Sequence, residues 1–348
     1  MSGAALIAAR RFQYPGFEQK CGANPCPARE EAATLKYYYA EHREGYERLK
    51  AEGKTAWAEI HGQEGFDNFC SRAFLESVLP TLRFSDPEPT VLEYGCGTGP
   101  GACFLAERGF DVDAIDLVPS AIALAKEIAA RRGLHIHFEV GDVCELPRNG
   151  KQYDLIVDSY CLQCIVLDDE RQRVFSAVRS RLKRNGYYLV STAILDQEHE
   201  EMIGNRKTKD PNTGIVYTQY GPGLIDLETG IALRRFDDEL DEYSDTVSIA
   251  GQCYLPHRRH LRPSALTAEL EAAGFTVTYR DAHHAGSIAC TLGNKLPDKS
   301  DADDGSRRGS RSALQRRSWI KTNDPTPCKG IRANGPRRRI ATRLCWAS

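Results

Sequence analysis

One seven-residue stretch constrains the fold of this chain more than any other. It follows the apolar run 91–94, precedes a helical run at 101–108, and reads Glu93-Tyr94-Gly95-Cys96-Gly97-Thr98-Gly99. Glycines at alternate positions let a backbone adopt positive φ and approach a ligand closely, and the next helix directs its N-terminus at that ligand. The turn alone leaves the ligand open, because residues 97–102 also fit the GxGxxA form of a dinucleotide fingerprint. A tight strand-to-helix turn without any ligand is the other interpretation.

The residues around this turn alternate between strand and helix patterns. Helices are expected at 101–108, 120–132 and 170–184, and strands at 91–94, 112–117, 136–140, 153–160 and 187–193. Strands alternating with helices of this length indicate right-handed crossovers. The predicted fold is therefore α/β and Rossmann-like, with a mostly parallel sheet and helices on both faces.

Five segments are expected along the chain. Residues 1–84 form a lead-in and a helical cap with helices at 28–51 and 66–82, and residues 85–193 form the core. The alternation is lost over 194–262, where only 215–220 and 231–236 are strand-like, and an insertion of this length is typically a lid over the substrate. A helix at 264–273 and strands at 275–279 and 287–292 close the core within 263–296. Residues 297–348 are predicted to be a disordered basic tail, either for an anionic partner or without a role.

Composition and charge exclude some classes of protein. Hydrophobic residues make up 41% and charged residues 27% of the chain, as in ordinary globular proteins. The apolar run 4–9 is too short to span a bilayer and lacks the flanks of a secretion signal, so we expect a cytoplasmic protein without a membrane partner. Residues 298–348 hold 13 Lys and Arg against 5 Asp and Glu, which leaves 33 basic and 43 acidic residues in 1–297. An acidic body argues against nucleic acid as the main partner.

The twelve cysteines do not form a regular framework. Cys161 and Cys164 form a CxxC pair after a predicted strand. A zinc site usually requires two such pairs, so we expect no bound metal.

Acidic residues stand at the ends of the three predicted strands that follow the turn: Asp116, Asp142 (followed by Val143) and Asp158. A carboxylate at the tip of the second strand can accept both hydroxyl protons of a ribose. At the end of the third strand, a carboxylate can accept a hydrogen bond from an adenine amino group. Carboxyl ends of parallel strands meet at one edge, so these features predict a nucleotide-type ligand.

Residues 91 to about 193 resemble the class I S-adenosylmethionine (SAM)-dependent methyltransferases, in particular the small-molecule methyltransferase-domain group. The resemblance rests on the acid-x-Gly-x-Gly-x-Gly turn, in which Glu93 replaces the commoner Asp. It implies a seven-stranded sheet with an antiparallel last strand, SAM as cofactor, and direct in-line methyl transfer to an oxygen or nitrogen of a small molecule. It also implies cofactor-binding roles for Glu93, for Gly95, Gly97 and Gly99 at the methionine, Asp116 at the ribose, Asp142 and Val143 at the adenine, and Asp158 near the methionine end.

Two groups of residues are candidates for contact with the substrate. The resemblance places residues 158–164 beside the methyl group, where Tyr160 and Gln163 stand at positions that often carry histidine in related sequences. We expect them to position the substrate. The basic segment 254–262, with Tyr254, His257, Arg258 and Arg259, can bind a carboxylate or phosphate, although a solvated basic turn is the alternative.

Three other functions stay open on sequence alone. An NAD(P)-dependent Rossmann oxidoreductase is disfavoured because Glu93 precedes the glycines. A non-catalytic SAM-binding protein would keep the same turn. A nucleic-acid or protein methyltransferase is also compatible, but the Asn/Asp-Pro-Pro-Tyr motif of base methylation is missing at 158–161. The acceptor, its reacting atom and the oligomeric state are not defined by the sequence.

Overall fold

The computed structural model describes residues 36–60, 65–236, 245–281 and 286–292. The predicted tail at 297–348 and most of the lead-in lie outside these residues. Among the residues that the structure describes, no helix is both long and apolar enough to cross a lipid bilayer.

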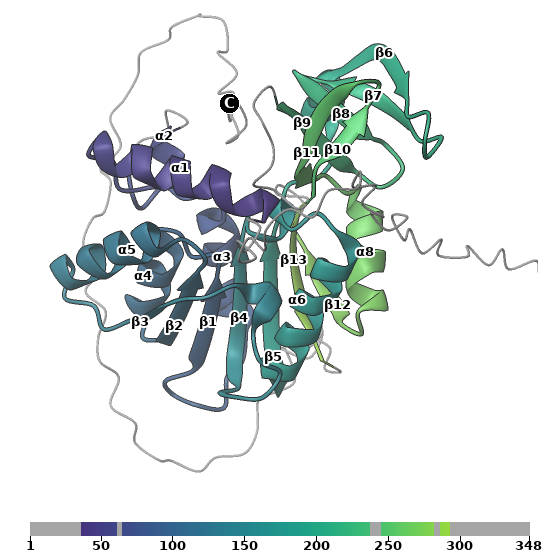
Figure 1. The fold of residues 1–348 in the computed structure, drawn as a ribbon. Helices are drawn as coiled ribbons and strands as arrows, with labels where there is room; N and C mark the ends of the chain where they lie inside the picture. Colours follow the sequence, from purple (N-terminus) through teal and green to yellow (C-terminus); the bar gives the residue numbers. More distant parts are fainter. Residues whose placement is uncertain (1–35, 61–64, 237–244, 282–285, 293–348) are drawn as a thin grey trace, which may run out of the picture. The chain divides into compact units, whose positions relative to one another are not determined.

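The core is a seven-stranded sheet with the order β12-β13-β5-β4-β1-β2-β3 (Figure 1). Its strands are β1 (Thr90–Tyr94), β2 (Asp111–Asp116), β3 (His137–Val140), β4 (Tyr153–Ser159), β5 (Leu182–Ser191), β12 (Thr276–Arg280) and β13 (Ser287–Thr291). The pairs β1–β2, β2–β3, β1–β4 and β4–β5 are parallel. Strand β13 is antiparallel to both β5 and β12. This confirms the predicted Rossmann-like sheet.

Helices cover both faces of the sheet because its strands are apolar on both sides. Along β1, Val91 packs into the cluster with α3, α4 and α5, whereas Leu92 packs into the cluster with α6 and α8. The helices are α3 (Arg72–Val78), α4 (Pro100–Ala106), α5 (Pro119–Arg131), α6 (Asp168–Arg181) and α8 (Pro263–Ala272). A proline begins α4, α5 and α8, where the missing N–H has no helical partner in any case.

Two predicted helices are shorter in the structure. The helix expected at 66–82 covers only α3 and a 3₁₀ turn at Leu79–Thr81, because 65–71 form a turn in which the carbonyl of Asp67 accepts a hydrogen bond from Arg72. The helix expected at 170–184 ends at Arg181, and β5 begins at Leu182. Lys183 is drawn into the strand by its ion pair with Asp154 on β4, 2.7 Å away.

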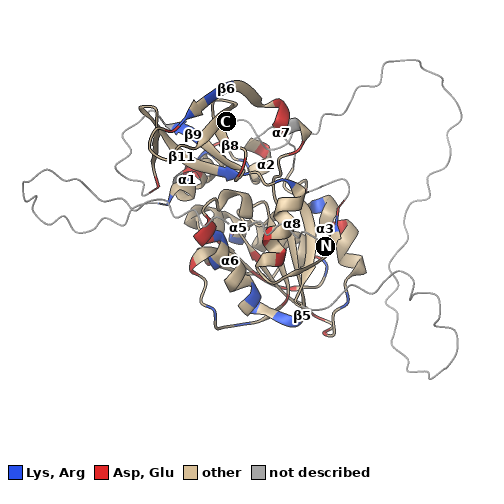
Figure 2. Cartoon of the chain, turned by 90° about the vertical axis from the view of Figure 1, so that its right-hand side faces the viewer, with Lys and Arg blue, Asp and Glu red and all other residues tan. Residues whose placement is uncertain are grey.

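The segment 194–262 contains a second sheet, of which the sequence predicted only two strands, at 215–220 and 231–236. Six antiparallel strands follow the order β10-β11-β9-β8-β7-β6. They are β6 (Ile203–Lys209), β7 (Val216–Tyr220), β8 (Gly223–Asp226), β9 (Ile231–Phe236), β10 (Val247–Ile249) and β11 (Gln252–Arg259), preceded by α7 (Gln197–Glu201). Helix α1 (Tyr37–Ala51) lies beside β11 (Figure 2), and α2 (Trp57–Ile60) packs against α1.

Candidate active site

A cavity of about 790 Å³ lies at the carboxyl ends of the core strands. This volume is in the upper part of the ~300–1,000 Å³ range of ligand pockets. Its walls come from the turn after β1, the ends of β2 and β3, the loop after β4, helices α1 and α2, and strands β7, β9 and β11. The strand order reverses between β1 and β4, and open α/β sheets bind ligands at such a switch point.

The glycine turn passes its backbone unusually close to neighbouring side chains. Gly95 and Gly97 line the cavity with φ of +63° and +55°. A Cβ on Gly95 would meet Cys161 Sγ at 2.4 Å, and one on Gly97 would meet Tyr46 Oη at 2.4 Å. Gly99 does not line the cavity and instead packs on Phe138. The backbone of the turn therefore forms part of the cavity wall at Gly95 and Gly97, and we call these two residues the glycine cradle.

Asp116 is fixed between the glycine turn and the end of β2. Its Oδ2 accepts the Gly97 N–H at 2.8 Å and its Oδ1 accepts the Val118 N–H at 2.9 Å. Burial raises the pKa of this carboxyl, while the two N–H donors oppose the shift. Each carboxylate oxygen has a second lone pair, so the side chain, which lines the cavity, can still accept two ligand hydroxyls.

Glu93 lies beneath the cradle and lines the cavity. Burial raises the pKa of its carboxyl to about 8, although hydrogen bonds from Ser159 and the Ala102 backbone act to lower it. Its Oε2 is buried without a hydrogen-bond partner among the described residues. A Cβ on Gly101 would meet Oε1 at 2.1 Å, so a glycine at this position in α4 makes room for the carboxyl group.

Asp142 also lines the cavity, and Val143 lies beside it. Its Oδ1 caps the 3₁₀ turn at Val143–Glu145 by accepting the Cys144 N–H at 2.8 Å. Its Oδ2 accepts the Tyr38 hydroxyl proton at 2.9 Å. A residue of the N-terminal helix thus contacts the carboxylate at the end of β3.

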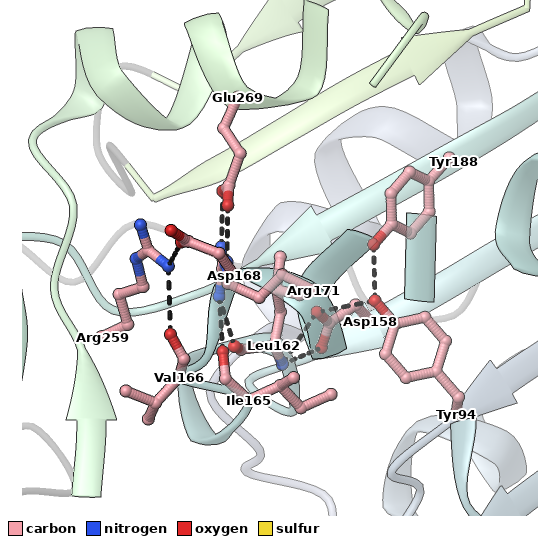
Figure 3. A network of polar contacts seen from close by, with 10 residues as sticks. All are labelled: Tyr94, Asp158, Leu162, Ile165, Val166, Asp168, Arg171, Tyr188, Arg259 and Glu269. Carbon is pink, nitrogen blue, oxygen red and sulfur yellow. Dashed lines mark hydrogen bonds and ion pairs between the residues drawn. The ribbon is translucent and has the colours of Figure 1, made fainter. Parts of the chain in front are cut away.

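Asp158 is fully buried, and its side chain is not among those that line the cavity. It accepts the Cys161 N–H at 2.7 Å and the Tyr94 hydroxyl proton at 3.0 Å, as Figure 3 shows for the tyrosine. Burial raises the pKa of Asp158 to about 7, and these hydrogen bonds oppose the shift. Its direct role is to shape the turn after β4.

A buried arginine holds the same turn from the other side (Figure 3). Arg171 on α6 donates to the carbonyls of Leu162 and Ile165, at 2.7 and 2.9 Å. It also makes a two-pronged ion pair with Glu269 on α8, both contacts at 2.6 Å. The loop that carries the predicted substrate-positioning residues is therefore anchored by buried charge.

Tyr160 and Gln163 both line the cavity. Tyr160 has a φ of +66°, which is uncommon for a residue with a side chain, and its N–H donates to the Ser191 carbonyl at 2.7 Å. Gln163 Oε1 accepts the Ala193 N–H at 3.0 Å. Backbone strain of this kind is often stored at functional sites.

Helix α1 supplies several cavity residues that were not selected from the sequence as site residues, among them Glu41, His42 and Tyr46. His42 and Tyr46 lie with Tyr38 at a four-residue spacing, which puts the three on one helix face. This spacing was the available signal, but an aromatic stripe on a helix is more often core than site. Tyr38 is buried as a core residue would be, and it also lines the cavity.

His42 has a defined orientation. Its Nδ1 donates to the Tyr38 carbonyl at 2.5 Å, its Nε2 lies 3.6 Å from Cys164 Sγ, and its ring stacks on Trp57 with centroids 5.4 Å apart. Burial works against the charged imidazole, but the Cys164 sulfur and the Glu41 carboxylate outweigh it and raise the pKa to about 9.

The basic segment is a strand and not a solvated turn. Glu41 accepts two hydrogen bonds from Arg258 at 3.0 and 2.8 Å, and lies 3.3 Å from His257 Nε2. Burial would raise the pKa of Glu41, but Arg258 outweighs it and holds the pKa well below its usual value. His257 and Arg258 line the cavity, whereas Tyr254 and Arg259 do not. Arg259 pairs with Asp168 (Figure 3).

The sheet order, the cradle at its switch point and Asp116 behind that cradle agree with the fold and site that the resemblance to class I SAM-dependent methyltransferases implies. Residues 91–186 match the family described as a methyltransferase domain, which supports this class and SAM as the cofactor.

The curated relatives that match this chain are methyltransferases, and their sequence identity to it is about 30%. The chain is 28% identical over 182 residues to the 2-heptyl-1-hydroxyquinolin-4(1H)-one methyltransferase of Mycobacteroides abscessus, covering 48% of this chain and 78% of that protein. It is 31% identical over 176 residues to a ubiquinone biosynthesis O-methyltransferase of Rickettsia prowazekii, covering 50% of this chain and 64% of the relative. It is also 31% identical to the ubiquinone biosynthesis O-methyltransferase of Rickettsia canadensis, covering 40% of this chain and 52% of the relative.

Solved structures that align with this chain are more distant in sequence. A SAM-dependent methyltransferase from Clostridium acetobutylicum aligns with a TM-score of 0.49 and 16% identity, over 72% of this chain and 99% of that chain. The CcbJ methyltransferase from Streptomyces caelestis aligns with a TM-score of 0.47 and 17% identity, over 73% and 96% of the two chains.

Proposed function

We propose that this protein transfers the methyl group of SAM to a hydroxyl oxygen, or alternatively a nitrogen, of a small planar acceptor. The observation that carries this proposal is the continuity of the cavity. The same cavity is lined by the glycine cradle and Asp116 at one part, and by Tyr220, Leu233 and Arg234 of the insertion at another.

The cradle and its carboxylates fit the cofactor. A Cβ on Gly95 or Gly97 would displace Cys161 or Tyr46, which line the cavity with the turn, and Asp116 has free lone pairs for ribose hydroxyls. Asp142 and Val143 are assigned to the adenine, with Tyr38 beside them, and Glu93 with its unpaired oxygen to the methionine part. When bound, SAM supplies an activated methyl group on a sulfonium.

Asp158 keeps an indirect role at the methionine end. It orders the turn that presents Tyr160 and Gln163 to the cavity, and these two residues position the acceptor. Holding two reactants in line can supply roughly 7–11 kcal/mol of the barrier reduction, so precise anchoring of this turn serves catalysis directly.

Aromatic side chains support a planar acceptor. Tyr38, Tyr46, Trp57, Tyr160 and Tyr220 all line the cavity. Aromatic rings favour offset-stacked or edge-to-face contact with other rings. The curated relatives' names, a hydroxyquinolone methyltransferase and an O-methyltransferase of ubiquinone biosynthesis, support a hydroxyl on such a ring.

The basic strand contributes to the acceptor site through its two cavity-lining members. His257 and Arg258 are held by Glu41, so an anionic acceptor group would compete with that carboxylate. Tyr254 and Arg259, which lie outside the cavity lining, are assigned to supporting β11.

The proposal also includes the roles of the chain segments and the cellular location of the protein. Residues 85–193 and 263–296 form the core, and the cap lies within 1–84. The insertion 194–262 acts as a lid over the acceptor. A cytoplasmic location is supported by the eight described cysteines, which are all free thiols. The partner is a small molecule and not nucleic acid, as the acidic balance of residues 1–297 suggests.

The experiment is a transfer assay with methyl-labelled SAM against a panel of simple phenols, hydroxyquinolones and amines, read by mass spectrometry. We expect a labelled methyl ether from at least one phenol or hydroxyquinolone. Labelled amines alone would move the assignment to nitrogen. Binding of SAM without transfer to any acceptor, including a metabolite extract, would favour a non-catalytic binding protein.

A further inference from the structure

We propose that His42 accepts the proton of the acceptor hydroxyl during methyl transfer, an inference that rests on the proposed function. The sequence analysis found no histidine in the loop after β4, where Tyr160 and Gln163 stand. The structure brings one to that loop from helix α1, through the contact between His42 and Cys164.

The tautomer of His42 follows from its contacts. A backbone carbonyl can only accept, so the Nδ1 bonded to Tyr38 carries a hydrogen. In the neutral ring the lone pair is then on Nε2, the nitrogen that faces Cys164 at the cavity wall. A carbonyl that fixes the opposite nitrogen is the usual way in which a protein orients a histidine base.

Helix α1 places His42 between the two parts of the cavity. On the same helix face, Tyr38 contacts Asp142, and Tyr46 contacts the Gly97 backbone, both in the cofactor part. Glu41, one residue before His42, contacts Arg258 of β11 in the insertion. A group between these contacts is close to both reactants.

Four acidic residues of the cavity wall are committed elsewhere, and His257 is paired with one of them, Glu41. Asp116 and Asp142 each accept two hydrogen bonds within the protein. Glu41 is held by Arg258 and His257, and Glu93 is packed beneath Gly101 of α4. His42 Nε2 has one weak partner, a thiol at 3.6 Å, which an incoming hydroxyl can replace.

The surrounding charges set the basicity of His42. Cys164 and Glu41 favour its protonated form, burial and Arg258 oppose it, and Asp116 on β2 is also close enough to interact with it. With a pKa of about 9, most of the imidazole is protonated at neutral pH, so His42 accepts the acceptor proton through its neutral fraction, which grows as the pH approaches 9.

The step balances without another reactant. The O–H bond of the acceptor breaks and an N–H bond forms on Nε2. The oxygen forms its bond to the methyl carbon as the carbon–sulfur bond of the sulfonium breaks. The products are the methyl ether, the neutral thioether and an imidazolium, which returns its proton to water.

The test compares two acceptors that differ in their need for a base. Catechol enters protonated at neutral pH, whereas the nitro group of 4-nitrocatechol makes a hydroxyl largely ionised. For His42→Gln, assayed at about pH 8.5, where catechol is still mostly protonated and part of the imidazole is neutral, we expect kcat/KM with catechol to fall by about 100-fold, as for loss of a general base. With 4-nitrocatechol we expect a fall of less than about 10-fold. His135→Gln, at an exposed residue outside the cavity wall, is the control and should leave both rates unchanged.

Two further readouts separate the outcomes. SAM affinity by calorimetry and NMR titration of the His42 imidazole need no turnover, and we expect unchanged affinity in His42→Gln and a wild-type imidazole that titrates well above 6.5. Equal losses with both catechols, in a variant that still binds SAM, would overturn the role of His42 and leave the proposed function standing. A wild-type protein that binds SAM but methylates no acceptor would remove the proposed function, and this inference with it.

Discussion

Tyr38 donates its hydroxyl proton to Asp142 across 2.9 Å, which links the N-terminal helix to the end of β3. Because the cavity is lined by both residues, α1 is part of the cavity wall at the end of β3. We therefore predict that Tyr38→Phe weakens SAM binding by about tenfold, since a hydrogen bond to a charged group contributes about 1.5–3 kcal/mol. Calorimetry measures the effect. Tyr39→Phe, next to it but outside the cavity lining, should bind SAM normally.

The two-pronged pair of Arg171 with Glu269 anchors the turn after β4 (Figure 3). Arg171→Met leaves a buried carboxylate and two carbonyls without their donor, so we predict a loss of about 3–5 kcal/mol in the free energy of unfolding. Denaturant unfolding is the measurement. The matched control is Arg173→Met on the same helix, whose more exposed pair with Asp169 should contribute only about 0–1 kcal/mol. Similar losses in the two variants would contradict the anchoring role of Arg171.

Glu93 gives a prediction about pH. Its folded-state pKa is raised to about 8 by burial, above the ordinary value of 4.5, so the folded protein holds a proton that the unfolded chain releases. The stabilising contribution is complete below about pH 4.5 and is lost as the pH rises toward 8. Glu93→Gln cannot ionise, so its unfolding free energy relative to wild type should rise between pH 5 and pH 8.5. A difference that stays constant across this range would show that Glu93 does not hold the proton.

A substitution at Asp116 is expected to weaken SAM binding while the protein stays folded. Asp116→Asn keeps the shape of the side chain but replaces one acceptor oxygen with a donor. We expect SAM affinity to fall by more than tenfold while the far-ultraviolet circular dichroism stays that of the wild type. Unchanged affinity would place the ribose elsewhere.

Much of the core could be predicted from sequence because its strands and helices alternate with clear periods. The closing strands near Val277 and Ile288 were found for the same reason. The insertion sheet was not, because a strand such as Ile203–Lys209 is mostly polar and exposed, and pairing across the sheet, not local pattern, makes it a strand.

The candidate site shows the same division between local and long-range information. Glycines and acidic residues at strand ends carry a local signal, so the sequence points to Gly95, Gly97 and Asp116, which line the cavity. Whether Asp158 points into the cavity or into the core depends on Tyr94, which lies 64 residues before it. His42 lies 122 residues before Cys164, and no local pattern connects them.

The central claim, that SAM binds at the glycine cradle, is tested most directly by calorimetry on a matched pair of glycine variants. Gly97 and Gly53 have φ of +55° and +65°, so alanine strains the backbone alike at both. A Cβ on Gly97 meets Tyr46 Oη at 2.4 Å, whereas a Cβ on Gly53 meets nothing within 4 Å. We predict that wild type and Gly53→Ala bind SAM with micromolar affinity and do not bind NAD, and that Gly97→Ala loses SAM binding. No heat with SAM in the wild type, or equal binding by the two variants, would contradict this account.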